Sequence, residues 1–462
     1  MTEFYYDKIV KYWISAVCDT PLHIGSADGG QGEVLVHPAD RRPFIQASSL
    51  AGAFQDYYRS VYGEEGRVRR QTFGSAPERQ ASALRLTDAV FEKADMELRP
   101  RLKIDRYSGT CLIEKTAGSD VPSGQKFEEE YVAQGAEFSF QAYLKGMAAE
   151  SEMEKAALEE AFEACLAACD AGEIRLGGRK GSGSGRIRLK RVSKRSFRLR
   201  DWEDRRDWQR EESLAENQAE DITEAVRQKK TSSKTAYQIT AVCVTEGELL
   251  VKGIAGDAGG EDLNGQNMQN AAGKDIIPGT SWKGIMRSRA ESIAEYLKLD
   301  DFAQGMFGSK SQKGGKGRSS QVWVEDSVVE KAGKEGGRPP VRTRIAIDKF
   351  TGGVRYGAMV RDRPVSGTLT LSIRIRKNPQ ADSQCAMLLL ILRDLDAGLI
   401  SVGGTGAAGR GYLRIKEIKI KGEQQAVITQ KDPEKREIQV EDPGGLIKRC
   451  LGALKEKRGQ GA

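Results

Sequence analysis

Hydrophobic spacing in the first half of the chain switches between strand-like and helix-like. Apolar residues recur at every second position over 11–18, which predicts a half-buried strand. Ser48 or Ser49 can cap a helix that runs to about Tyr62. Further elements are predicted as strands at 85–91, 136–142 and 186–192, and as a helix rich in Ala, Glu and Leu at 150–171. Gly172 fits the C-terminal stop of that helix.

The second half repeats this order of strand, helix, two strands, helix and strand. Its predicted elements are 236–245, 280–297, 320–326, 366–376, 384–396 and 412–418. This order is the ferredoxin-like arrangement, which the RNA-recognition motif also uses. The sequence therefore predicts an α+β protein with two tandem ferredoxin-like domains and antiparallel sheets.

Four sequence landmarks support a duplication because they recur in the same order. The clearest is a glycine-rich loop that follows the second helix of each copy. The matched segments are 44–52 with 276–284, 73–75 with 307–309, 105–109 with 348–352, and 174–187 with 400–413. Insertions in the loops between shared elements explain why the spacing between matched segments varies.

The duplication defines four regions of the chain. The first domain is predicted at 1–197 and the second at 236–421. Between them, 198–235 is dense in charge, contains Trp202 and Trp208, lacks strand periodicity and is interpreted as a linker that is part helix. A charged C-terminal tail at 422–462 ends in an amphipathic stretch.

Composition narrows the class of protein. The 462 residues carry 73 Lys and Arg against 66 Asp and Glu, a net charge of +7 that favours a polyanionic partner if it is concentrated on one face. Seven scattered cysteines and two histidines predict neither a disulfide framework nor a zinc site. Cys165 and Cys169 are one helical turn apart and could share a metal, but alanine-rich surroundings favour small core residues. No apolar run reaches membrane-spanning length and the N-terminus begins no signal peptide, so we expect a cytoplasmic protein without a membrane partner.

The two glycine loops are candidate phosphate-binding elements. Glycine lets backbone N–H groups approach phosphate, and neighbouring cations neutralise it. The candidate RNA-binding residues here are Gly177, Gly178, Arg179, Lys180, Gly403, Gly404 and Arg410. The alternative is a turn that closes a sheet and uses glycine for positive φ.

Hydroxyl residues at each predicted first-helix start form a second candidate site. Ser48 and Ser49 in the first copy and Ser281 in the second place side chains where the helix dipole favours an anion. Lys283 and Arg287, one turn apart, could extend that site. Ordinary helix capping is the alternative.

A cation followed by an aromatic residue recurs in the third landmark. Arg106 and Tyr107 correspond to Lys349 and Phe350, and an aromatic ring beside a phosphate-pairing cation suits single-stranded RNA. A hairpin with one buried aromatic residue would give the same pattern. His23, a further candidate RNA-binding residue, follows the first strand without a histidine counterpart in the second copy; a lone histidine is more often structural than catalytic.

Acidic residues in glycine-rich loops after each first strand are the candidates for catalysis. Asp28 and Glu33 lie in the first copy, and Asp257 and Asp262 in the second. Such loops could hold a divalent metal or orient an RNA 2′-hydroxyl for attack on its own phosphate, although acids in glycine loops are commonly turn formers. No Ser/His/Asp set or Walker loop points to another hydrolase class.

Taken together, four of these segments resemble the repeat-associated mystery protein (RAMP) superfamily of CRISPR systems. They are LHIGS at 22–26, IPGTSWKG at 277–284, IDKFTGG at 347–353 and GGTGAAGRG at 403–411. The closest likeness is to backbone subunits of type III effector complexes, and two such domains in one chain resemble the tandem fusions of type III-D-like complexes.

This resemblance implies a modified RNA-recognition-motif palm with a protruding thumb hairpin that kinks the duplex of guide crRNA and target RNA. It also implies a target-cutting aspartate about fifteen residues before the Pro-Gly-Thr-Ser element, which favours Asp262 over Asp257. In the first copy Gln46 and Ala47 replace Pro-Gly, so the assignment to Asp28 or Glu33 is less direct. Mg²⁺ or Mn²⁺ is the expected metal, with Asp262 and Asp28 as ligands. Within the same superfamily, a purely structural guide-binding subunit and a guide-processing endoribonuclease are the alternatives.

Overall fold

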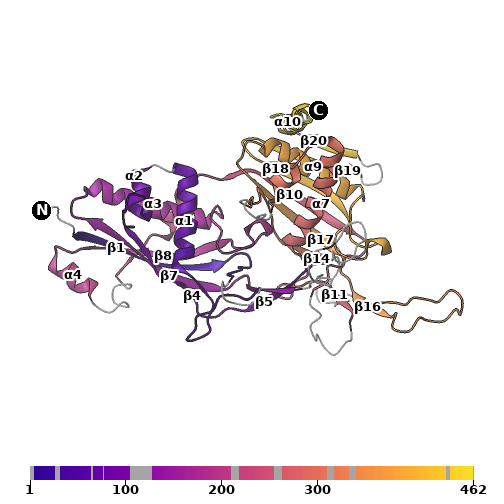
Figure 1. Ribbon diagram of the computed structural model, residues 1–462, viewed down its shortest axis with the longest axis horizontal. Helices are drawn as coiled ribbons and strands as arrows, with labels where there is room; N and C mark the ends of the chain where they lie inside the picture. Colours follow the sequence, from indigo (N-terminus) through magenta and orange to yellow (C-terminus); the bar gives the residue numbers. More distant parts are fainter. Residues whose placement is uncertain are drawn as a thin grey trace, which may run out of the picture. The chain divides into compact units, whose positions relative to one another are not determined.

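The computed structural model describes residues 5–25, 32–63, 66–75, 77–102, 104, 127–209, 218–253, 263–309, 317–331, 340–432 and 437–460 (Figure 1). The chain forms two compact units. The first comprises Met1–Glu97, Glu130–Lys180 and Ser184–Lys234, and the second comprises Leu98–Glu129, Gly181–Gly183 and Thr235–Ala462. Each unit contains an antiparallel sheet, as the sequence predicted.

The first sheet is built around β1 (Tyr6–Cys18), which pairs with β7 (Glu137–Met147) and β8 (Ile187–Arg198). The other members are β2 (Phe44–Ile45), β3 (Leu84–Leu86), β4 (Ala89–Phe91) and β9 (Glu220–Asp221). The central order β4-β7-β1-β8 places the last predicted strand beside the first, which confirms the ferredoxin-like arrangement.

Alternating residues of a strand point to opposite faces of the sheet, so the apolar ones form one apolar face, and helices cover it. They are α1 (Ala47–Tyr62), α2 (Arg67–Phe73) and α3 (Glu152–Asp170). Tyr12 of β1 packs edge-on against Phe162 of α3 with ring centres 5.1 Å apart, and Phe54 of α1 joins them. Cys165 and Cys169 are buried in the same core as free thiols.

The second sheet repeats the first around β10 (Thr235–Glu246), β17 (Gly367–Arg376) and β18 (Tyr412–Lys421). Its shorter strands are β12 (Ile276–Ile277), β13 (Val322–Val324) and β14 (Ser327–Lys331). Even the irregularity of the central strand recurs. The β1–β8 register shifts between Ser15 and Ala16, and the β10–β18 register shifts between Val242 and Cys243.

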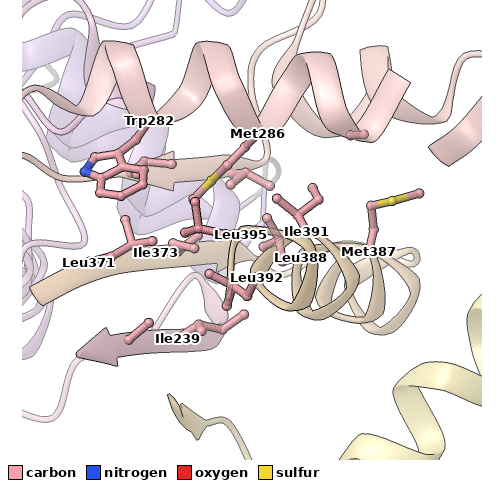
Figure 2. Close-up of a cluster of buried hydrophobic side chains, with 14 of the residues drawn as sticks. Ile239, Trp282, Met286, Leu371, Ile373, Met387, Leu388, Ile391, Leu392 and Leu395 are labelled. Carbon is pink, nitrogen blue, oxygen red and sulfur yellow. The ribbon is translucent and has the colours of Figure 1, made fainter. Parts of the chain in front are cut away.

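The core of the second unit lies between its sheet and the helices α7 (Gly279–Leu297), α8 (Phe302–Phe307) and α9 (Ala381–Asp396). Figure 2 shows Trp282 and Met286 of α7 with apolar side chains of α9 and the sheet. The Trp282 indole N–H donates to the Ser327 hydroxyl at 3.0 Å, so its one polar atom is satisfied.

Residues predicted as a charged tail are part of this second unit. The sheet continues into β19 (Gln425–Asp432) and β20 (Glu437–Glu441). The amphipathic stretch forms α10 (Leu446–Gln460), which buries Leu446, Cys450 and Leu454 in the core. The predicted domain boundary at 421 therefore falls between two paired strands.

The predicted linker contains two short helices, α4 (Trp202–Trp208) and α6 (Thr223–Gln228). Trp208 lies 5.4 Å from the Phe197 ring and 5.7 Å from the Tyr143 ring, and Asp207 pairs with Arg195 at 2.7 Å. These contacts cover part of the sheet face that α1 and α3 leave open.

Two strand pairs lie apart from the main sheets. One is β5 (Met96–Arg101) with β6 (Phe127–Val132). The other is β15 (Arg342–Arg344) with β16 (Val360–Arg363), to which β11 (Gly265–Gln266) adds a third strand. The segment joining β15 to β16 projects from the second unit as a long orange hairpin (Figure 1). Among the helices placed by the structure, none is long and apolar enough to cross a bilayer.

Candidate RNA-binding site

The two glycine loops have the same backbone conformation. Positive φ angles occur at Gly177, Arg179, Gly183 and Gly185, and again at Gly403, Thr405, Gly409 and Gly411. Each loop contains one short 3-10 turn, η1 (Lys180–Ser182) or η2 (Gly406–Ala408). The landmark match in the sequence is therefore also a match in geometry.

Glycine is required in these loops because the backbone passes very close to the segment after the first strand. A Cβ at Gly177 would lie 2.3 Å from the His23 carbonyl oxygen, and a Cβ at Gly403 would lie 2.3 Å from that of Leu250. The next N–H in each loop is used internally: Gly178 donates to His23 O at 2.7 Å, and Gly404 donates to Leu250 O at 2.9 Å. The sheet-closing role is thus observed, whereas phosphate contact stays a prediction.

The same hydrogen bonds identify the second-copy counterpart of His23 as Leu250, a buried apolar residue. His23 itself is half-buried, and its Nδ1 lies 2.9 Å from the Glu130 carbonyl oxygen. Its ring centre is 5.1 Å from that of Tyr131. These contacts fit the structural reading of a lone histidine.

Charge around the loops differs between the copies. In the first copy Arg179 is exposed and Lys180 is half-buried, while Arg186 pairs with Asp19. In the second copy Arg410 is only 6% exposed. Its Nε lies 3.2 Å from Glu248 Oε2 and its Nη1 lies 3.0 Å from Asp362 Oδ2, so this predicted phosphate ligand is engaged inside the protein.

The start of each first helix is capped by an aspartate from a neighbouring strand connection. Asp88 accepts the Ala47 N–H at 2.7 Å, and Asp326 accepts the Gly279 N–H at 2.8 Å. The prediction that Ser48 or Ser49 caps α1 is wrong, since the N-cap is Gln46 and both serines lie exposed in the first turn. A carboxylate already occupies the position that the helix dipole would offer to an anion.

The remaining candidates on α7 are spread along one helix. Ser281 and Lys283 are half-buried, and Ser281 donates its backbone N–H to Pro278 O at 2.9 Å. Arg287 pairs with Glu291 through Nε and Oε1 at 2.9 Å. Ser281 lies in the first turn of α7, and Lys283 and Arg287 follow it along the helix.

The projecting hairpin presents the most exposed candidates. Phe350 and Tyr356 are fully exposed, at 100% and 107%, and Lys349 is exposed beside Phe350. The tip is shaped by Asp348, which accepts the N–H groups of Phe350 at 2.9 Å and Thr351 at 3.0 Å. The backbone hydrogen bonds from Thr351 and Phe350 hold the pKa of Asp348 below its usual range. Exposed aromatic rings on a protruding hairpin indicate a binding surface.

Several candidates lie outside the described residues, namely Arg106, Tyr107 and the catalytic candidates Asp28, Asp257 and Asp262. Glu33 is described and exposed. Within the part of the chain that is described, no three His, Cys, Asp or Glu side chains are grouped so that they could hold a metal ion.

Comparison with known families agrees with the duplication. The RAMP superfamily profile matches residues 16–188 and again residues 239–414. These two segments make up well over half of the chain, which therefore belongs to the RAMP superfamily as a two-domain member. Members of this superfamily bind CRISPR RNA and work with partners in CRISPR complexes. No curated protein matched the chain.

Proposed function

We propose that this chain is a guide-binding backbone subunit of a type III CRISPR effector complex that also cleaves the complementary target RNA. The observation that carries the proposal is the repetition of one glycine-loop geometry in two RAMP domains, each beside the end of the first strand. Two equivalent grips on one chain suit a ligand whose phosphates repeat at regular spacing.

The exposed side chains support contact with RNA. Arg179 and Arg188 at the first loop and Lys349 on the hairpin face solvent, where cations can neutralise phosphate without reading sequence. Phe350 and Tyr356 offer rings against which a displaced base can stack.

The proposed cleavage step uses Asp262 and, in the first copy, Asp28. The 2′-hydroxyl oxygen of the target attacks the adjacent phosphorus, and the bond from phosphorus to the 5′-oxygen breaks. The aspartate accepts the 2′-hydroxyl proton and water protonates the leaving oxygen, which yields a 2′,3′-cyclic phosphate and a 5′-hydroxyl. Mg²⁺ or Mn²⁺, held by the same aspartates, would stabilise the charge that develops on the phosphate.

Target cleavage by the assembled complex tests this assignment. D262A and D28A should each remove one cut while the other cuts persist. D257A and E33A test the neighbouring acids, and D300A, which alters an exposed carboxylate on another segment, is the control. If every cut survives in the D262A/D28A double variant, the assignment of these two aspartates is wrong.

Guide binding is measured separately on the isolated full chain with a synthetic crRNA. K349A/F350A should weaken binding, whereas K455A, which removes one exposed charge from α10, should change it little. If the unmodified chain binds crRNA but cuts no target, only the structural guide-binding function remains. If K349A/F350A binds crRNA as tightly as the unmodified chain does, the proposed guide contact is contradicted.

A further inference from the structure

An ion-pair network connects the second glycine loop with the base of the projecting hairpin. Asp362 is 0% exposed, and its Oδ2 accepts from Arg344 Nη2 at 2.5 Å and from Arg410 Nη1 at 3.0 Å. Arg410 also reaches Glu248, whose Oε1 pairs with Arg342 Nε at 2.5 Å. One arginine of the loop thus bridges two carboxylates, and each carboxylate binds an arginine of β15.

These residues come from segments far apart in the sequence. Arg342 and Arg344 lie on β15, Asp362 lies on β16, Arg410 follows η2, and Glu248 follows β10. The backbone of the loop is attached at the same place, because Gly411 donates its N–H to the Glu248 carbonyl oxygen at 2.8 Å. The loop is therefore held to the segment after β10 by its main chain, and to the hairpin base by side chains.

Tight packing around Asp362 fixes this arrangement. Gly265 of β11 lies opposite Asp362, and a Cβ at Gly265 would be 2.8 Å from Asp362 Oδ1. Lys252 Nζ lies 4.0 Å from the same oxygen. A carboxylate without solvent contact stays charged only when paired, so the arginines cannot move away without a large penalty.

The first copy has only part of this network in its sequence. Arg101 Nε donates to Glu129 Oε2 at 2.6 Å, as Arg344 does to Asp362. Gly185 N donates to Pro21 O, which places Pro21 at the position of Glu248 and Ser184 at that of Arg410. Arg410 and Glu248 are thus replaced by a serine and a proline at the equivalent positions of the first copy.

We propose that Arg410 and Asp362 are positioning residues that hold the hairpin at a fixed orientation to the glycine loop, so that the second domain grips the guide with both parts as one rigid element. This inference rests on the proposed guide binding. Arg410 acts through Asp362 and Glu248 and makes no phosphate contact of its own. The hairpin tip, with Phe350, depends on this support.

A double-mutant cycle on guide affinity tests the proposal. We expect R410Q and F350A each to weaken binding of a synthetic crRNA by roughly tenfold, and R410Q/F350A to be no weaker than the worse single variant, because both remove the same hairpin contact. The matched control is R414Q, which removes a half-buried cation four residues later and should combine with F350A additively. Unchanged binding in R410Q, or additive losses in R410Q/F350A, would overturn the proposal.

Hydrogen exchange without RNA separates this inference from the proposed function. In the hairpin, Arg355 donates its N–H to Ala346 O and Asp348 donates to Gly353 O. R410Q should accelerate exchange of these amides at least several-fold, R410K should do so less, and R414Q should not. Equal exchange in R410Q and the unmodified chain refutes positioning even if RNA binds. Failure of the unmodified chain to bind RNA, with faster exchange in R410Q, refutes guide binding alone.

Discussion

The two copies of the fold share the backbone of the glycine loop but differ in the charges around it. Both close a glycine loop onto the segment after the first strand with the same hydrogen bonds and the same signs of φ. Around that common backbone, the first copy exposes Arg179, whereas the second copy buries Arg410 between Glu248 and Asp362. The backbone of the turn is thus the same in both copies, whereas the charged side chains around it differ in position and in burial.

The largest difference between copies should appear in the core. Trp282 lies three residues after the capped residue of α7, as Leu50 does in α1. W282A should lower the free energy of unfolding by about 3–5 kcal/mol and exceed L50A, because it removes a larger buried side chain and a hydrogen bond to Ser327. Chemical denaturation measures both. A smaller loss for W282A than for L50A would contradict the equivalence of the two positions.

The glycine loops should respond alike in the two copies. A Cβ at Gly185 or Gly411 would lie 2.0 Å from a carbonyl oxygen, and both residues have positive φ. G185A and G411A should each cost about 2–4 kcal/mol. G352A is the control, since that glycine has positive φ but an added Cβ would meet no atom within 4 Å, and it should cost about 1 kcal/mol. Unequal losses between the two loops would break the comparison.

The helix caps give a smaller, matched pair. D88A removes the carboxylate that accepts the Ala47 N–H and should cost about 1 kcal/mol, as expected for an N-terminal cap. D88N keeps an acceptor oxygen and should recover most of this loss. Thermal unfolding distinguishes the two variants, and equal loss in both would show that charge rather than hydrogen bonding stabilises the helix start.

Part of the acid sensitivity should come from a buried carboxylate in the first unit. Glu163 is largely buried; burial opposes its ionisation, but Lys194 and Lys229 outweigh it and hold its pKa below the usual range. Because the pKa of Glu163 is lower in the folded chain than in the unfolded chain, where a glutamate has a pKa of about 4.3, its ion pairs stabilise the fold fully above that unfolded pKa. This stabilisation is lost as the pH falls through the folded pKa. E163Q should make the free energy of unfolding depend less on pH in the acid range, as measured by denaturation at several pH values. An unchanged dependence would show that other groups cause the acid sensitivity.

The smallest effect on stability should come from the hairpin tip. Phe350 is fully exposed, so F350A should change the free energy of unfolding by less than about 0.5 kcal/mol. Its effect should appear in crRNA affinity instead. A large loss of stability would show that the ring packs inside the protein.

Sequence reasoning succeeded where structure is periodic or repeated. The helix at 280–297 and the strand at 366–376 were located within one residue of α7 and β17, because alternating and helical apolar spacing reports directly on a one-sided core. The glycine loops were also recognisable, since few residues other than glycine tolerate positive φ under a close carbonyl oxygen.

Long-range polar pairing escaped prediction. Asp88 and Ala47 are 41 residues apart, and Arg410 is 162 residues from Glu248, so no local sequence pattern predicts these hydrogen bonds. One signal was present in the sequence: an aspartate lies two residues after β3 and two residues after β13, at Asp88 and Asp326. The β19–β20 pair was missed for two reasons. β20 alternates apolar and polar residues but is only five residues long and exposed throughout, and β19 has only a three-residue apolar run next to polar and charged residues.

The helix α4 gives the connecting segment a purpose besides connection. Trp208 shields Phe197 and Tyr143, aromatic rings that would otherwise face water on the first sheet. Its length and composition are then constrained by the surface it hides. A shortened connector could still join two domains in one gene product, yet it would expose an aromatic patch that promotes aggregation during synthesis.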